Sequence, residues 1–196
     1  MLFYDTVLPH GTRLARVARV DRGAYDILTD AGPGRLAPLA EPERATVGDW
    51  LAVRADGSAT LLPRTSLLSR ASAAGTSRPQ LLAANVDVVL VCASLATKVP
   101  VRRIERLLTL AWESGARPVL VLTKADLHPD PASAVRSLLP HAPGAAVVTV
   151  CASAGSIDAL TPYAAAGSTL VLLGASGAGK STVVNALAGT SVMGTG

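Results

Sequence analysis

The spacing of apolar residues changes partway along the chain. Before residue 64, short stretches rich in apolar and β-branched residues are interrupted by turn sequences, such as Asp-Arg-Gly at 21–23 and Asp-Gly-Ser at 56–58. This pattern is typical of short antiparallel strands joined by tight turns. It predicts strands at residues 13–20, 25–29, 35–39, 50–54 and 59–62. The number of strands indicates a small β-barrel of the oligonucleotide-binding (OB) type.

A different pattern begins at residue 88, where apolar runs alternate with helical periodicity. The predicted strands are 88–92, 119–122, 146–150 and 169–173, and the predicted helices are 101–114, 132–139, 157–165 and 180–188. Such alternation predicts a parallel sheet with helices on both faces. The stretch 68–79, rich in Ser, Ala, Gly and Arg, is predicted to be a mobile loop. We therefore expect an α/β protein with an OB-fold barrel, loop and linker at 1–84 and a second domain at 85–196.

A phosphate-binding loop is predicted between strand 169–173 and helix 180–188. Residues 174–181 read Gly-Ala-Ser-Gly-Ala-Gly-Lys-Ser and fit the pattern G-x-x-x-x-G-K-[ST]. In that context, backbone N–H groups and the positive end of the helix dipole bind phosphates. We expect Lys180 to bridge the β- and γ-phosphates and Ser181 to ligate Mg²⁺, which makes them the candidate catalytic residues. The expected binding residues are Gly174, Ala175, Ser176, Gly177, Ala178, Gly179, Lys180, Ser181 and Thr182.

A guanine-reading sequence follows strand 119–122. It consists of Thr123, Lys124, Ala125 and Asp126. The Asp126 carboxylate can accept hydrogen bonds from the ring N–H and the exocyclic amine of guanine, whereas adenine would leave the charge unpaired. Lys124 would lie along the base. Taken alone, the tetrapeptide is more often an ordinary strand-to-helix turn, and the phosphate loop downstream reverses that preference in favour of the guanine interpretation.

A third nucleotide element is predicted after strand 146–150, at Cys151 and Ala152. GTPases usually have Ser-Ala there, and the backbone N–H of Ala152 would donate to guanine O6. Because that contact comes from the backbone, we expect the change from Ser to Cys151 to matter little.

In an ordinary GTPase the phosphate loop precedes the base reader, so the reversed order predicts a circularly permuted GTPase domain. Its expected strand order is 146–150, 119–122, 88–92, 169–173, with the last strand at an edge and prone to association.

With these residues in view, the chain resembles the circularly permuted small ribosomal subunit biogenesis GTPases, the RsgA family. The resemblance also covers Val47-Gly48-Asp49, Leu62-Pro63-Arg64 with Arg70, Ala84-Asn85-Val86-Asp87, and residues 192–196 as the start of switch I. It implies a cytoplasmic GTPase that is stimulated by the small ribosomal subunit during its late maturation. It also implies that the barrel faces ribosomal RNA. A zinc module is expected in the family, but this chain has only Cys92, Cys151 and three His residues and offers no zinc site.

The chain departs from the family pattern after the phosphate loop. Within its 196 residues, no D-x-x-G follows Lys180, so the magnesium-linked aspartate and the switch threonine are not among them. Because these groups position water and neutralise charge at the γ-phosphate, we expect these residues alone to bind guanine nucleotide but hydrolyse it poorly. A non-enzymatic guanine-nucleotide and RNA-binding factor is therefore an alternative. A P-loop ATPase or kinase is less favoured because of the guanine-reading sequence.

Charge and hydropathy limit the classes of partner that the protein can have. The formal net charge is +4 with a pI near 9.5, which fits a phosphate-rich partner but is equally typical of a solvated surface. Arg64, Arg70 and Arg78 are the predicted contacts to RNA phosphates. Apolar runs are far shorter than the roughly 18 residues that span a bilayer, so we expect a cytoplasmic protein with no membrane partner. We also expect a monomer.

Overall fold

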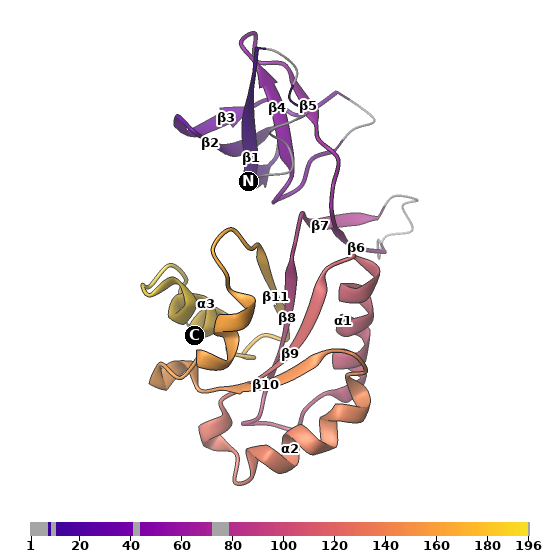
Figure 1. The fold of residues 1–196 in the computed structure, drawn as a ribbon, viewed down its shortest axis with the longest axis vertical. Helices are drawn as coiled ribbons and strands as arrows, with labels where there is room; N and C mark the ends of the chain where they lie inside the picture. The colour runs from indigo at the N-terminus through magenta and orange to yellow at the C-terminus, as the bar shows by residue number, and fades with distance from the viewer. Residues whose placement is uncertain (1–7, 9–10, 41–43, 72–78, 196) are drawn as a thin grey trace. The chain divides into compact units, whose positions relative to one another are not determined.

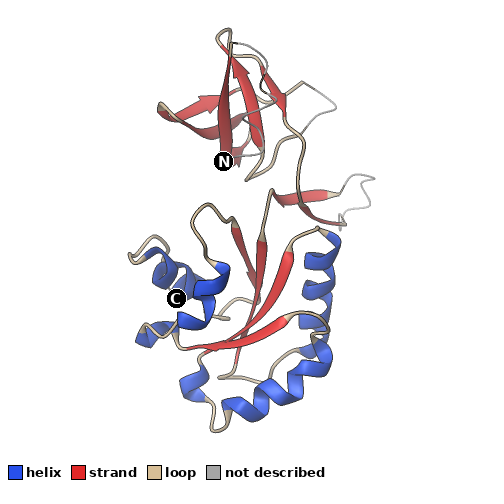
Figure 2. Cartoon of the chain, in the orientation of Figure 1, coloured by secondary structure: helices blue, strands red, loops and turns tan. Residues whose placement is uncertain are grey.

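A computed structural model describes residues 8, 11–40, 44–71 and 79–195. The chain forms two compact units, Met1–Asn85 and Val86–Gly196 (Figure 1). The first consists of strands and the second of strands and helices (Figure 2). Among the helices of the described ranges, none is long and apolar enough to cross a membrane.

The first unit contains a five-stranded antiparallel sheet. Its strands are β1 (Thr12–Asp21), β2 (Ala24–Thr29), β3 (Gly32–Leu36), β4 (Trp50–Arg54) and β5 (Ala59–Leu61), in the order β3-β2-β1-β4-β5. Alternate residues of neighbouring strands point to one face and form the core of the unit, as the period of two along a strand requires. The buried members of this core are Ala15, Val17, Tyr25, Ile27, Ala45 and Leu51.

Strand β3 begins earlier than the predicted 35–39, because the preceding turn is shorter than the run of turn residues at 30–34 suggests. Thr29 pairs directly with Gly32, and its hydroxyl donates to the Gly32 carbonyl at 2.9 Å. Only residues 30 and 31 therefore form the turn. Pro33 already lies within β3, which is tolerated because β3 is an edge strand of this sheet and needs no N–H on its outer side.

The predicted mobile loop at 68–79 is wrong at its start, where residues 68–70 lie in a strand. Strands β6 (Leu67–Arg70) and β7 (Gln80–Ala84) form an antiparallel hairpin, and the Leu68 side chain is fully buried. Residues 72–78, including Arg78, lie outside the described residues. The Ser, Gly and Arg residues within 68–79 hid the start of the hairpin, because they are typical of a loop.

A buried ion pair stabilises the first unit. The Asp49 side chain is 0% exposed and accepts hydrogen bonds from Arg64 Nε and Arg64 Nη2, each at 2.8 Å. The same Nη2 donates to the Arg44 carbonyl at 2.7 Å. The prediction that Arg64 contacts RNA phosphates is therefore replaced by a structural role. Hydrogen bonding to the Asp49 carboxylate raises the pKa of Arg64, so the guanidinium stays charged.

A second polar junction joins the turn at Gly48 to the end of β7. The Asn85 side chain donates to the Gly48 carbonyl at 3.0 Å and accepts from the Thr65 backbone N–H at 3.0 Å. Gly48 has φ of +89°, and a Cβ there would overlap the Ala84 carbonyl oxygen. The close approach of the two backbones thus requires glycine.

We predict that Gly48→Ala destabilises the first unit by about 1 to 3 kcal/mol, through the strained φ and the overlap with Ala84. Gly57→Ala is the matched control, because Gly57 also has positive φ (+83°) but a Cβ added there would meet nothing within 4 Å. Trp50 lies in the first unit and Trp112 in the second. Urea unfolding followed by tryptophan fluorescence in a Trp112→Phe background therefore reports on the first unit. Equal losses in the two variants would contradict the role of the Ala84 overlap.

The second unit is built on a four-stranded parallel sheet, whose order confirms the predicted one. Its strands are β8 (Val88–Ser94), β9 (Arg117–Thr123), β10 (Ala146–Val150) and β11 (Leu170–Gly174), in the order β10-β9-β8-β11. The central strands β8 and β9 are almost entirely buried, whereas every residue of the edge strand β11 is half-buried. Continuous apolar runs in β8 and β9 fit strands covered on both faces.

Helices cover both faces of this sheet. The α-helices are α1 (Val101–Glu113), α2 (Pro131–Leu138) and α3 (Lys180–Ala188). Val183 of α3 packs with Val88, Leu90 and Cys92 on one face. The alternate residues of β8 point to the other face, where α1 buries Ile104, Leu108 and Ala111 against β8 and β9. The two helices accordingly lie on either side of the strands in Figure 1.

The predicted helix at 157–165 is instead a 3₁₀-helix, η4, at Asp158–Tyr163. Pro162 lies inside it and has no N–H to donate, which opposes a regular α-helix. Three further 3₁₀ turns occur at Ala125–Leu127 (η1), Leu139–His141 (η2) and Ala152–Ala154 (η3). Both η1 and η3 overlap or directly follow a predicted nucleotide motif.

Candidate nucleotide-binding site

The three predicted nucleotide elements lie at the same edge of the parallel sheet. Each begins at the carboxyl end of a strand: the base reader after β9, Cys151 after β10, and the phosphate loop after β11. This edge is where open α/β sheets bind ligands. Segments separated by up to 55 residues in the sequence are thereby brought together.

A direct hydrogen bond joins the base reader to the phosphate loop. The Thr123 hydroxyl donates to the Ala178 carbonyl at 2.9 Å, and both residues are buried. The approach is close enough that a Cβ on Gly179, which has φ of +78°, would lie 3.2 Å from the Thr123 hydroxyl oxygen. Thr123 therefore fixes how far the base reader stands from the phosphate loop.

The following residues present their polar groups at the surface. Lys124 adopts a left-handed backbone conformation with φ of +55°, which is uncommon for a residue with a side chain. Asp126 is exposed in the turn that follows, and its Oδ1 accepts a hydrogen bond from the Cys151 thiol at 2.9 Å. Ala152 begins η3 next to Cys151 and is half-buried. The base reader and the third predicted element are thus in contact.

The phosphate loop leads into helix α3 with an N-terminus suited to an anion. Gly179 precedes the helix, no described side chain caps it, and its first turn carries no acidic residue. The first N–H groups of such a helix favour negative charge. The Lys180 ammonium donates to the loop carbonyls of Gly174 at 3.1 Å and Ala175 at 2.7 Å, which holds it over the loop. Ser181 and Thr182 follow in the first turn of α3 and are half-buried.

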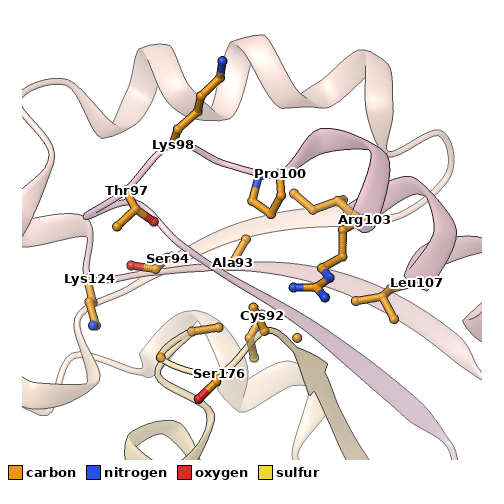
Figure 3. A pocket seen from close by; sticks show the side chains of 15 residues that line it. Cys92, Ala93, Ser94, Thr97, Lys98, Pro100, Arg103, Leu107, Lys124 and Ser176 are labelled. Carbon is orange, nitrogen blue, oxygen red and sulfur yellow. The ribbon is translucent and has the colours of Figure 1, made fainter.

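A cavity of about 350 Å³ adjoins the phosphate loop. It is bounded by residues 174–178, Lys124, the end of β8 and the start of α1 (Figure 3). The Arg103 guanidinium points into it, whereas Lys98 points away. With Lys98 directed away, the lining still contains the cationic side chains of Arg103 and Lys124 and no carboxylate, so it favours an anionic ligand. Sequence analysis did not single out Arg103, because a charged residue on the polar side of an amphipathic helix carries no signal of a nearby cavity.

The cavity wall includes one cysteine, Cys92. Burial raises the pKa of its thiol to about 12, although Lys180 opposes the shift. Such a thiol stays protonated at neutral pH and packs as a small apolar group. Cys92 is therefore not a candidate nucleophile.

Metal ligands are sparse at this edge. In residues 8, 11–40, 44–71 and 79–195, no three His, Cys, Asp or Glu side chains cluster as a metal site would require. The Ser181 hydroxyl at the start of α3 is a hard oxygen of the kind that Mg²⁺ accepts. Mg²⁺ bound with a nucleotide takes most of its remaining ligands from phosphate and water, so one hydroxyl fits such a site.

Comparison of the chain with known proteins identifies its family. A model of the RsgA GTPase family matches residues 61–196, which is most of the chain. The chain belongs to the RsgA GTPase family. Two Streptomyces relatives are both named small ribosomal subunit biogenesis GTPase RsgA. The one from S. avermitilis is 44% identical over 202 residues, which cover 97% of this chain and 54% of the relative. The one from S. coelicolor is 46% identical over 190 residues, which cover 91% and 52%.

Solved structures confirm the predicted fold class. YjeQ from Thermotoga maritima matches with a TM-score of 0.68 and 25% identity, over 90% of this chain and 65% of that one. YloQ, described as a circularly permuted GTPase, matches with a TM-score of 0.61 and 22% identity, over 90% and 64%. The fold is thus α/β, with an OB-type antiparallel sheet followed by a circularly permuted GTPase domain. The chain spans about half the length of the two Streptomyces RsgA relatives.

Proposed function

We propose that the chain binds GTP and GDP at this edge of the second unit. The observation that carries the proposal is the Thr123–Ala178 hydrogen bond, because it sets the base-reading turn beside the phosphate loop. A guanosine phosphate carries hydrogen-bond donors on its base and negative charge on its phosphates, so it needs an acceptor at one end and donors or cations at the other. Here the exposed Asp126 carboxylate stands at one end and the amides and ammonium of the loop stand at the other.

Each predicted residue has a role in this arrangement. Asp126 would accept from the guanine ring N–H and amine, Lys124 would lie along the base, and Ala152 would donate from its backbone to O6. The amides of residues 174–179 and the first turn of α3, including Thr182, would bind the α- and β-phosphates. Lys180 would leave the Gly174 and Ala175 carbonyls to reach the β- and γ-phosphates. Mg²⁺ held by Ser181 would neutralise charge on the same phosphates.

We further propose that the protein hydrolyses GTP as a cytoplasmic factor in maturation of the small ribosomal subunit. The names of the Streptomyces relatives and the family match support this. Stimulation by the subunit, contact of residues 1–84 with ribosomal RNA, and a monomeric state are part of the same proposal. GTP hydrolysis measured with and without small subunits tests it. Because these residues alone are expected to hydrolyse GTP poorly, the deciding measurement is the one with small subunits: nucleotide binding without turnover there would favour the non-enzymatic assembly factor.

Isothermal titration with GDP, GTP and ATP tests the nucleotide assignment. We expect both guanine nucleotides to bind and ATP to bind far more weakly, because adenine does not offer the Asp126 carboxylate the two donors that guanine offers. Binding of ATP as tight as that of GTP would overturn the guanine assignment and favour an ATPase or kinase.

Removal of the hydroxyl that joins the two motifs should weaken binding without changing the base preference. We predict that Thr123→Ala raises the Kd for GDP about five- to tenfold, the effect of losing one buried hydrogen bond. Thr123→Ser keeps the hydroxyl and should bind within about twofold of the original protein. Titration of both variants with GDP checks this. If Thr123→Ala bound GDP as tightly as Thr123→Ser, the Thr123–Ala178 contact would not position the binding site.

A further inference from the structure

Arg103 is a cation beside the phosphate loop to which none of the nucleotide motifs gives a role. It lies on α1, and its guanidinium points into the cavity that residues 174–178 help to form (Figure 3). We propose that Arg103 binds the γ-phosphate of GTP and thereby distinguishes GTP from GDP. This inference rests on the proposed guanine-nucleotide site. It adds to that site a contact from α1, which carries none of the predicted nucleotide motifs.

The order of groups along the cavity puts Arg103 at the end where the last phosphate would lie. Lys124, which would lie along the base, and Arg103 stand toward opposite ends of the lining in Figure 3. The phosphate loop contributes residues 174–178 to the same lining. The γ-phosphate is the phosphate farthest from the base. A nucleotide with its base at Lys124 would therefore direct its γ-phosphate toward Arg103.

The Lys180 ammonium marks the same region of the cavity. It donates to the carbonyls of Gly174 and Ala175, and both of these residues belong to the lining. Burial raises the pKa of the Cys92 thiol in the cavity wall to about 12, and Lys180 lies close enough to oppose that shift. Because Lys180 is expected to bridge the β- and γ-phosphates, the γ-phosphate would lie near this wall, within the cavity that Arg103 enters.

The surroundings leave the Arg103 charge available to an anion. The lining contains no carboxylate, and within the described ranges no Asp or Glu forms an ion pair with Arg103. The wall of the same cavity is partly apolar, with contributions from Cys92, Pro100, Ile104 and Leu107. Cationic groups in a cleft with apolar walls attract anions more strongly than they do on an open surface. A planar guanidinium can also donate two parallel hydrogen bonds to the oxygens of one phosphate.

Comparison of GDP with GMPPNP, a non-hydrolysable analogue of GTP, isolates the γ-phosphate without requiring turnover. Isothermal titration in the presence of Mg²⁺ measures the two Kd values. We expect Arg103→Ala to raise the Kd for GMPPNP about tenfold and to leave that for GDP within about twofold. The factor is at the low end for a lost hydrogen bond to a charged group, because Arg103 is exposed.

Two further variants separate a specific contact from a general effect of charge. Arg103→Lys retains the charge but not the planar fork, and it should recover part of the loss. Arg102→Ala is the matched control, because it removes the same charge from an exposed neighbour that does not line the cavity. It should leave both Kd values within about twofold of those of the original protein.

Salt gives the same test without a comparison of folds. Raising KCl from about 0.1 M to about 1 M shortens the Debye length from about 10 Å to about 3 Å. The preference for GMPPNP over GDP should therefore fall more in the original protein than in Arg103→Ala, which has already lost the contact. An equal fall in both proteins would contradict a direct contact between Arg103 and the γ-phosphate.

The outcomes distinguish this inference from the proposed function. If the original protein failed to bind GDP, the guanine-nucleotide site itself would be wrong, and this inference with it. If that protein binds GDP, but Arg103→Ala weakens GDP and GMPPNP by the same factor or changes neither, Arg103 does not bind the γ-phosphate. An equal loss of GMPPNP affinity in Arg102→Ala would also overturn the inference, because the effect would then come from net charge.

Discussion

Asp126→Asn is expected to weaken GDP binding about a hundredfold and to improve the binding of XDP, because the amide reverses the hydrogen-bond pattern offered to the base. Guanine presents two donors, and an asparagine side chain can accept only one of them. Its NH₂ group would face the remaining donor. Xanthine carries a carbonyl where guanine carries the exocyclic amine, so the same NH₂ group becomes a complementary donor. The exposure of Asp126 means that the exchange should not disturb the packing.

Titrations of the original protein and the variant with GDP, XDP and ADP check this result. Lys180→Ala is the informative control, because Lys180 acts on phosphates that all three nucleotides share. It should weaken GDP and XDP by similar factors, and the order of preference should stay that of the original protein. An Asp126→Asn variant that binds all three nucleotides in the original order would show that Asp126 does not read the base.

Local sequence patterns were sufficient for the sheet and for the placement of the motifs. Strand β11, the phosphate loop and α3 follow one another within one short segment, so their pattern needs no distant information. The parallel direction of the strands then follows because each base-reading or phosphate-reading turn must reach the same edge, whereas their order came from the resemblance to GTPases. The start of β3 was harder to predict, because the Thr29–Gly32 pairing shortens the turn, although residues 30–34 are all typical of turns.

The interactions that position the site could not be read from the sequence. Cys151 contacts Asp126 across 25 residues, and Thr123 contacts Ala178 across 55, so neither pair falls within one turn or strand. The same holds for Arg64, which pairs with Asp49 across 15 residues. An arginine beside a flexible-looking segment has the same sequence signature whether it binds a phosphate or a buried carboxylate. Only the burial of its partner decides between the two.

That burial also changes how contacts to RNA should be sought in the first unit. Arg70 donates to the Gln80 side chain at 2.8 Å at the exposed edge of the β6–β7 hairpin. Its guanidinium has further N–H groups that could donate to a phosphate. A substitution at Arg70 therefore tests RNA binding with little effect on folding, whereas one at Arg64 affects the core. Loss of small-subunit binding on changing Arg64 would be an indirect effect of unfolding.

Arg64→Met should destabilise the first unit by about 3 to 5 kcal/mol, because it leaves the Asp49 carboxylate buried without a cation. Asp49 is 0% exposed and would retain the Thr46 N–H at 2.7 Å as a donor. Arg70→Met, at an exposed position, should cost less than about 0.5 kcal/mol. Urea unfolding in the Trp112→Phe background, with Trp50 as the reporter, measures both.

A double variant shows whether the unpaired charge is the cause. Asp49→Asn removes that charge and can keep an oxygen for the Thr46 N–H, so Asp49→Asn with Arg64→Met should be more stable than Arg64→Met alone. If the loss came only from missing packing of the arginine side chain, the second substitution would bring no recovery. A double variant less stable than Arg64→Met would therefore contradict the electrostatic explanation, and would show that Asp49 stabilises its turn without help from Arg64.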